Sequence, residues 1–239
     1  MKKSLLLFLS VCTLMVSCKK DDPNDNTPPP PEPYKCTTCI TTPEAKAAYD
    51  DNSGGVYKGV LVGSTGTIAL YLYNTGTEVK ALVAFDGQNA ELSTTSLSGW
   101  TPGQAISNAL FTGTINGQAV TATFSVDANG QNPMVSVNIP GHTVNVAIYK
   151  ETSATLIRNF EGTYAGDDNG VFNMVMSGDD FTIVTDGGTP FGGTLVNGKI
   201  DLSNNGVEVK GEFQGTDHVE GTWKDSQNKT GTWTGNRTL

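Results

Sequence analysis

Two cysteines, Cys36 and Cys39, are separated by two threonines, a spacing found in redox, zinc and haem-attachment sites. Each of these sites needs a further feature. A redox pair sits in a βαβ unit, which this sequence does not show, and zinc needs further ligands close by. Haem attachment needs a histidine after the second cysteine, where Ile40 stands. We therefore predict a small local disulfide or two idle thiols.

The residues that could support catalysis do not form a recognisable constellation. His142 and His218 have no serine or cysteine beside them in a nucleophile setting, and no Gly-x-Ser-x-Gly motif occurs. Acidic pairs stand at residues 50–51, 167–168 and 179–180, whereas a glycosidase needs two carboxylates facing one cleft. Because these pairs adjoin glycine or asparagine, we predict that they serve turns. The chain is expected to have no catalytic residues and not to be an enzyme.

Calcium is the alternative role for some of these turn acids. Asp127 and Asn129 precede a glycine, as do Asp167 and Asp168, and their oxygens are ligands that Ca²⁺ prefers. Neither segment has the full Asp-x-Asp-x-Asp-Gly loop with a distal glutamate. We predict no metal and no other cofactor, and keep these four residues as calcium candidates.

Aromatic side chains are the remaining candidates for ligand contact: Tyr71, Tyr73, Trp100, Trp223 and Trp233. They could stack on sugar rings or line a pocket, and the alternative is that they fill the interior of a sheet. Tyr71 and Tyr73 alternate with leucines, which predicts that both rings lie on one face of a strand.

The elements that must position these residues are strands. From Gly55 onward, apolar and polar residues alternate with a period of two, which is typical of a sheet covered on one side. Glycine is abundant, at 28 of 239 residues, and recurs with Thr, Asn and Asp between short apolar stretches. Frequent turn residues between short strands predict an all-β chain.

The strand-rich part repeats itself in the same order. Residues 55–59 match 162–166, and residues 66–72 match 170–176. Weaker matches join Phe111-Thr112-Gly113-Thr114 to Phe213-Gln214-Gly215-Thr216, and Val120 with Phe124 to Val219 with Trp223. We predict two related β units, residues 55–152 and 153–239, each with seven or eight short strands.

Each unit is expected to be an antiparallel meander curled into a small barrel, with a β-sandwich as the alternative. A meander hides its edges by pairing its first strand with its last. In the second unit, residues 162–166 and 231–235 carry matching glycine and aromatic positions, so we predict that they are closing partners. In architecture and composition the body resembles lipocalin- or calycin-like barrels and the barrel lobes of surface lipoproteins such as transferrin-binding proteins.

The first residues have the order of a secretory signal peptide: Lys2 and Lys3, an apolar run over residues 5–16, then Ser17 and Cys18. The run is shorter than the roughly 20 residues of a membrane span. Met15-Val16-Ser17-Cys18 resembles the lipobox of bacterial lipoproteins. This resemblance implies cleavage after residue 17 and acylation of Cys18, with palmitate among the attached chains.

Residues 18–35 are rich in proline and lack aliphatic side chains up to Pro33, which predicts an extended, disordered linker. Cys18-Lys19-Lys20-Asp21-Asp22 resembles the anchor region of Bacteroidetes outer-membrane lipoproteins. In that group this pattern implies export to the outer cell surface.

Residues 36–54 join the linker to the β units. Thr42 can cap a helix, Pro43 suits its first position and Glu44 favours its positive end, so we predict a short helix through Tyr49.

The formal net charge of −9 makes nucleic acid an unfavourable partner, because an acidic surface repels phosphates. Membrane contact is then expected through acyl chains on Cys18 rather than through a basic patch. We predict a lipid-anchored, surface-exposed protein of the outer membrane that binds a small ligand, a glycan or a protein without catalysis. The alternative is a structural or assembly subunit of an outer-membrane complex.

Overall fold

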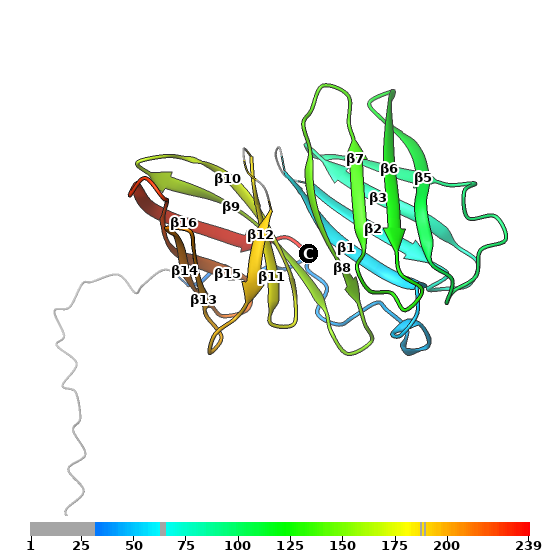
Figure 1. The fold of residues 1–239 in the computed structure, drawn as a ribbon, viewed down its shortest axis with the longest axis horizontal. Coiled ribbons are helices and arrows are strands. Elements are labelled where there is room, and N and C mark those ends of the chain that lie inside the picture. Colours follow the sequence, from blue (N-terminus) through cyan, green and yellow to red (C-terminus); the bar gives the residue numbers. More distant parts are fainter. Residues whose placement is uncertain (1–31, 63–65, 187, 189) are drawn as a thin grey trace, which may run out of the picture. The chain divides into compact units, whose positions relative to one another are not determined.

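The computed structural model describes residues 32–62, 66–186, 188 and 190–239, which fold almost entirely into antiparallel strands (Figure 1). The predicted signal peptide, the lipidation site Cys18 and most of the predicted linker lie outside these residues. Within them, no helix is both long and apolar enough to cross a membrane. Residues Pro33–Leu239 cluster as one compact unit that contains all the strands.

The strands form two eight-stranded sheets. The first contains β1 Gly55–Val62, β2 Gly66–Leu72, β3 Val79–Phe85, β4 Gln88–Ser93, β5 Ile106–Ile115, β6 Gln118–Val126, β7 Met134–Asn138 and β8 Asn145–Glu151. The second contains β9 Ile157–Gly166, β10 Gly170–Ser177, β11 Asp180–Thr185, β12 Phe191–Thr194, β13 Ile200–Asn204, β14 Val207–Gln214, β15 His218–Lys224 and β16 Thr230–Arg237.

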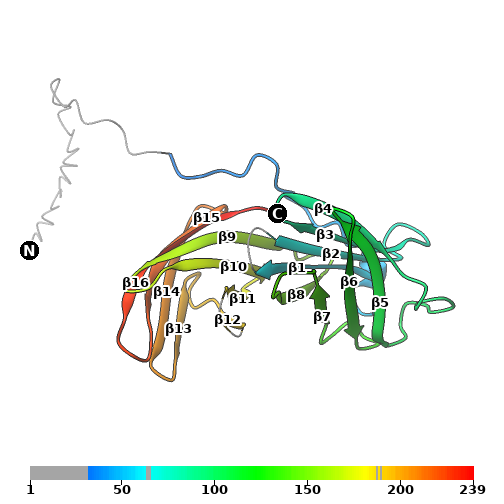
Figure 2. The ribbon, with the colours of Figure 1, turned by 90° about the horizontal axis from the view of Figure 1, so that it is seen from above.

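Both sheets have the connectivity of an up-and-down barrel. The strand orders are β7-β6-β5-β4-β3-β2-β1-β8 and β12-β11-β10-β9-β16-β15-β14-β13. In each sheet the first strand pairs with the last, and one neighbouring pair is left unjoined, β7 with β8 in the first sheet and β12 with β13 in the second. Figure 2 shows how strongly the strands of both sheets curve. The predicted fold class, all-β with two related barrel-like units, is confirmed.

The predicted closure of the second sheet is confirmed residue by residue. In the pairing of β9 with β16, Gly162 lies opposite Gly235, Tyr164 opposite Trp233, and Gly166 opposite Gly231. The matching glycine and aromatic positions of the two strands are therefore direct cross-strand partners.

The repeat assigned from sequence holds for residues 66–72 and 170–176, which lie in the second strand of each sheet, but its other matches are wrong in register. Gly59 pairs with Ile68 in the first sheet, and Gly162 holds the same place opposite Phe172 in the second, so residues 55–59 are four positions too early. The later matches also fail, because Phe111 lies in the fifth strand of its sheet and Phe213 in the sixth. Glycine and threonine recur in most strands here, so such matches carry little register information.

The predicted shared face of Tyr71 and Tyr73 is also wrong. Strand β2 ends at Leu72, and Tyr73 has φ of 62°, which turns its side chain into the core of the first sheet. Tyr71 lies on the outer face, where its hydroxyl donates to Glu44.

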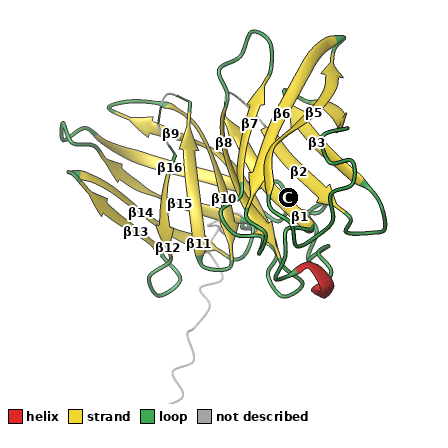
Figure 3. Ribbon diagram, turned by 45° about the vertical axis from the view of Figure 1, so that its right-hand side comes forward, coloured by secondary structure: helices red, strands yellow, loops and turns green. Residues whose placement is uncertain are grey.

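The predicted helix over residues 42–49 is reduced to one 3-10 turn, η1 Ala47–Tyr49, drawn red in Figure 3. The backbone N–H groups of Glu44 and Ala45 donate instead to a carboxylate oxygen of Glu151 in the first sheet. Tertiary hydrogen bonds therefore replace the helical ones that the local sequence favours.

Three apolar clusters stabilise the fold. The interior of the first sheet is filled by aliphatic side chains together with Phe85, Phe111 and Phe124. The interior of the second is dominated by aromatic and methionine side chains. A third cluster joins the outer faces of the two sheets and consists of Val60, Ala147, Ile157, Val175 and Val184.

A candidate binding pocket in the second sheet

A pocket of about 160 Å³ lies at one end of the second sheet. Its wall includes Tyr164, Phe172, Ile183, Phe191, Trp223 and Trp233. These residues come from the last part of β9, β11 and β15 and from the first part of β10, β12 and β16. Because neighbouring strands run in opposite directions, these parts all meet at the end where the β9–β10, β11–β12 and β15–β16 turns stand.

The aromatic rings of the wall contact one another edge to face. Tyr164 and Trp223 have ring centroids 6.1 Å apart at 85°, and Phe172 and Trp233 have centroids 5.5 Å apart at 90°. This arrangement is the one aromatic quadrupoles favour, so the rings hold one another in place.

Glycines on the inner face make room for these rings. A Cβ atom built at Gly211 would overlap the ring of Trp233, and one at Gly231 would overlap Trp223. Each indole can therefore lie close to a strand backbone, which a larger residue at the glycine would prevent.

The wall also contains Thr185, Lys224 and Asp225, but the surface that faces the pocket is apolar. The Trp233 indole N–H donates to the backbone oxygens of Lys210 and Thr222, while the Trp223 N–H is buried without a hydrogen-bond partner among the described residues. The Tyr164 hydroxyl donates to Asp186 at 3.2 Å. Burial, and then the charge of Asp186, raises the pKa of Tyr164, so the phenol stays protonated.

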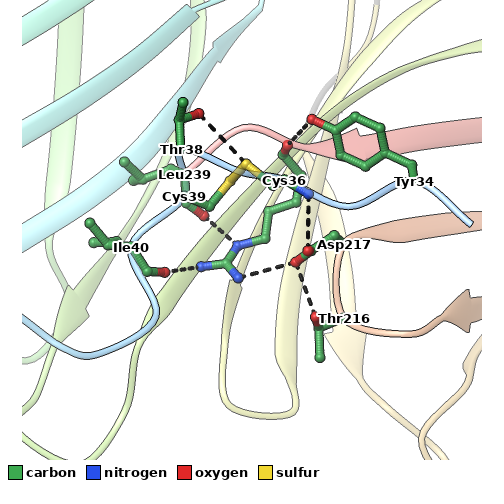
Figure 4. The surroundings of a disulfide bond; sticks show 9 residues. Tyr34, Cys36, Thr38, Cys39, Ile40, Thr216, Asp217 and Leu239 are labelled. Carbon is green, nitrogen blue, oxygen red and sulfur yellow. Dashed lines mark hydrogen bonds and ion pairs between the residues drawn. A yellow bond between two sulfur atoms is a disulfide. The ribbon is translucent and has the colours of Figure 1, made fainter.

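The opposite end of the second sheet is contacted by Tyr34, Cys36 and Ile40. These residues belong to the segment 33–46, which we call the strap. The Tyr34 hydroxyl donates to the backbone oxygen of Arg237, and the Cys36 N–H donates to Asp217 at 3.1 Å (Figure 4). The Arg237 guanidinium contacts Asp217 at 3.3 Å and also donates to the Ile40 backbone oxygen. These contacts lie before β15 and at the end of β16, away from the pocket.

Asp217 is ionised at neutral pH within this network. Burial on its own would raise the pKa of its carboxyl, but donors from Cys36, Thr216 and Arg237 outweigh that effect and lower the pKa. The strap also contains a disulfide between Cys36 and Cys39, whose Cα atoms are 5.6 Å apart.

Further along, the strap is fixed to the first sheet by a buried ion-pair cluster. The Lys58 ammonium lies 2.8 Å from both Glu44 and Glu151, and Lys58 and Glu151 are fully buried. Glu151 also accepts hydrogen bonds from the backbone of Ala45 in the strap and of Ile157 in β9. One carboxylate thus connects the strap and both sheets.

Of the five aromatic residues predicted as ligand contacts, the structure brings two together in the pocket, Trp223 and Trp233. Trp100 is buried in the core of the first sheet, where its indole N–H donates to Gln104, and Tyr73 packs on its ring. Tyr71 lies on the outer face. Tyr73, Trp100 and Tyr71 therefore serve the first sheet and not the pocket.

The calcium candidates accept hydrogen bonds from other groups of the chain, within their own turns except for Asp167. Asp127 accepts from the Asn132 side chain, and Asn129 accepts from the Gln131 backbone. Asp167 accepts from the backbone and hydroxyl of Thr230, and Asp168 accepts from the Asn169 backbone. In the part of the chain that is described, no group of three His, Cys, Asp or Glu side chains could hold a metal ion.

Tyr164, Phe172 and Phe191 were missed from sequence. A usable signal was present, because residues 162–164 and 231–233 alternate glycine with an aromatic residue on the face that points inward. That alternation marks the pocket wall as well as the closing pair.

No protein-family model matches the chain, and comparisons with curated proteins and with solved structures give no match either. The interpretation of the pocket therefore depends on its own geometry.

Proposed function

We propose that this protein is a non-catalytic binding protein of the bacterial cell envelope, and that the aromatic pocket of the second sheet holds one apolar group of the bound molecule. The observation that carries this proposal is the pocket itself. Its volume of about 160 Å³ is close to that of apolar cavities, about 150 Å³, that hold a benzene ring. The pocket is thus suited to one ring or one large apolar side chain.

The composition of the wall favours an apolar group over a sugar. A sugar ring carries several hydroxyls, and each hydroxyl buried without a hydrogen bond costs about 1–3 kcal/mol in proteins. The indole N–H of Trp233 is already used by two backbone oxygens. A hexose would therefore leave most of its hydroxyls unpaired.

The sequence supports the proposed envelope location, through the predicted acylation of Cys18 and the linker that follows it. Its test is mass spectrometry of the protein extracted from membranes of a producing bacterium. We expect residues 1–17 to be absent and the new N-terminal cysteine to carry acyl chains. A Cys18→Ala variant should keep its leader and lose the acyl mass. An unmodified cysteine in the wild-type protein would overturn this part of the proposal.

The pocket is tested by ¹⁹F NMR of protein labelled with 5-fluorotryptophan. The chain has three tryptophans, of which Trp223 and Trp233 line the pocket and Trp100 lies in the first sheet as an internal control. Single Trp→Phe variants assign the signals. Toluene should shift the two pocket signals saturably and leave Trp100 unchanged, while methyl glucoside should shift none. Absence of a toluene response, or an equal shift of Trp100, would contradict the proposal.

A further inference from the structure

The second sheet has two unpaired strand edges beside the pocket. Strands β12 and β13 follow one another in the chain, yet they stand at opposite ends of the strand order and share no ladder. A single bridge between Val196 and Lys199 closes only the turn that joins them. We call these two facing edges the seam of the second sheet.

On β12, Gly192 and Thr194 face the seam. The Leu195 N–H donates to the Asp179 backbone oxygen at 2.9 Å, so residues 195, 193 and 191 are those that bond with β11. Along an antiparallel strand, successive residues direct their backbone N–H and C=O groups to opposite sides. The backbone groups of Gly192 and Thr194 therefore point away from β11 and toward the seam.

On β13, Asp201 and Ser203 face the seam. The hairpin to β14 has a two-residue turn, Asn205 and Gly206, both with positive φ. In such a turn the flanking pair is hydrogen-bonded, so Asn204 and Leu202 bond with β14. The backbone groups of Asp201 and Ser203 are therefore directed away from β14.

Apolar side chains are exposed beside the seam. Phe191 is 36% exposed, Val207 is 40% exposed and Val196 is 51% exposed. Phe191 and Val207 also line the pocket, so the pocket is continuous with the seam.

We propose that the molecule bound by the second sheet is an extended peptide segment of a partner protein, which pairs with the seam and inserts one apolar side chain into the pocket. This inference rests on the proposed function of the pocket. Backbone pairing along a free edge supplies affinity, and a pocket for one side chain supplies specificity. An extended peptide is the class of molecule that offers both, whereas a free aromatic molecule would leave the strand edges unpaired.

Charge specifies the peptide further. Residues 179–211, which contain the seam and the partner residues of β13, carry five acidic side chains, Asp179, Asp180, Asp186, Asp201 and Glu208, and two basic side chains, Lys199 and Lys210. Lys199 is paired with Glu212 and Lys210 with Glu208. Lys210 is the cross-strand neighbour of Asp201, but among the described residues no ion pair joins the two. Side chains that flank the inserted residue point to the outer face, where Asp201 lies exposed. Lysine or arginine at these flanking positions would form cross-strand pairs.

The test uses the peptide acetyl-Thr-Lys-Phe-Lys-Thr-amide as the probe, with two matched controls. One control is N-methylated on the backbone nitrogens of both lysines, which blocks pairing along one edge and keeps every side chain. The other replaces phenylalanine with alanine, which empties the pocket. Binding is measured by the ¹⁹F shifts of Trp223 and Trp233, and we expect each control to bind at least tenfold more weakly than the probe.

A variant tests the same edge from the protein side. Thr194→Pro removes one N–H that faces the seam and leaves the bonds of residues 191, 193 and 195 to β11 in place. Thr194→Val is its matched control, because it keeps that N–H and removes only the hydroxyl that donates to Asp180. The proline variant should bind the peptide at least tenfold more weakly and respond to toluene as the wild-type protein does. The valine variant should match the wild-type protein in both.

The outcomes separate this inference from the proposed function. A toluene response without peptide binding overturns the peptide proposal and leaves the apolar pocket intact, and loss of both responses overturns the pocket. Equal binding of the probe and the N-methylated peptide, or an unaffected proline variant, shows that one of the two edges takes no part and also overturns the peptide proposal.

Discussion

The two sheets share one strand connectivity and differ in what fills them. In the first sheet, valines of β7 and β8 pack against a core of aliphatic and aromatic side chains, so side chains close the interior where the strands are unjoined. In the second sheet, Phe191 and Val207 stay exposed beside the seam and the interior ends in a pocket. Strand pairing alone therefore does not decide whether the interior of such a sheet is filled or contains a pocket.

The difference lies in the residues that point inward. In the second sheet, the rings of Trp233 and Trp223 lie against Gly211 and Gly231. Each large ring is thus matched with a residue that has no side chain. In the first sheet, fully buried rings such as Phe111 and Phe124 pack together with many aliphatic side chains. The two interiors therefore differ in the aliphatic side chains that accompany the rings, and close packing of a core needs such side chains to fill the space between large groups.

The largest expected effect tests whether the sheets unfold as one body. Glu151→Ala should lower the free energy of unfolding by about 3–5 kcal/mol, because it leaves Lys58 buried with one fewer partner and removes the acceptor of the Ala45 and Ile157 N–H groups. Urea titration followed by the ¹⁹F signals of Trp100 and Trp223 measures both sheets at once. A double variant with Lys58→Met and Glu151→Leu should recover much of the loss. Equal stability of the single and double variants would contradict this account.

A matched pair of truncations compares the two interiors. Phe124→Ala should cost about 3–5 kcal/mol, because its ring is fully buried in the first sheet. Trp223→Ala should cost clearly less, since its ring is partly exposed at the pocket. The toluene response should survive in the first variant and vanish in the second. If both truncations were equally costly, the second interior would be as closely packed as the first.

A single methyl group tests the glycine and ring arrangement. Gly211→Ala should displace the Trp233 ring, cost about 1–3 kcal/mol and weaken toluene binding. Thr232→Ser is the control, because Thr232 adjoins Trp233 on β16 and points to the outer face. Normal toluene binding by the Gly211→Ala variant would contradict this account, because it would show that the Trp233 ring can move without narrowing the pocket.

The smallest expected effect is a pH dependence confined to the first sheet. Burial lowers the pKa of Lys150 to about 8, although Asp50 and Asp51 oppose the shift, and its ordinary value is 10.5. Between pH 8 and pH 10.5 the unfolded chain then binds more protons at this residue than the folded chain. Stability should therefore rise with pH in this window, and Lys150→Met should remove that contribution. Parallel pH profiles of the two proteins in urea titrations would contradict the assignment.

Much of the fold was predictable because a period of two fixes strands and their inner faces. The alternation that identified β9 and β16 also gave their pairing, since glycine and aromatic residues recur on facing strands. The positive φ of Tyr73 was not predictable, because tyrosine seldom adopts it and the residue follows an unbroken alternation.

The long-range polar contacts were equally hidden. Nothing near Lys58 in sequence indicates its pairing with Glu151, which lies 93 residues away. The helix predicted over residues 42–49 does not form for the same reason. The backbone N–H groups of Glu44 and Ala45 donate to this distant carboxylate and not to helical carbonyl groups. In the pocket, Trp223 and Trp233 were found by residue type, whereas Phe191 comes from a four-residue strand with no alternation to reveal it.

The position of the strap has a mechanical consequence. Tension applied along the chain at Tyr34 would be borne first by the bonds of Cys36 and Ile40 to Asp217 and Arg237. Those bonds lie at the end of β15 and β16 that is far from Trp223. The applied force is therefore not transmitted through the aromatic rings of the pocket. A molecule held from its N-terminal side against drag can keep this pocket undistorted.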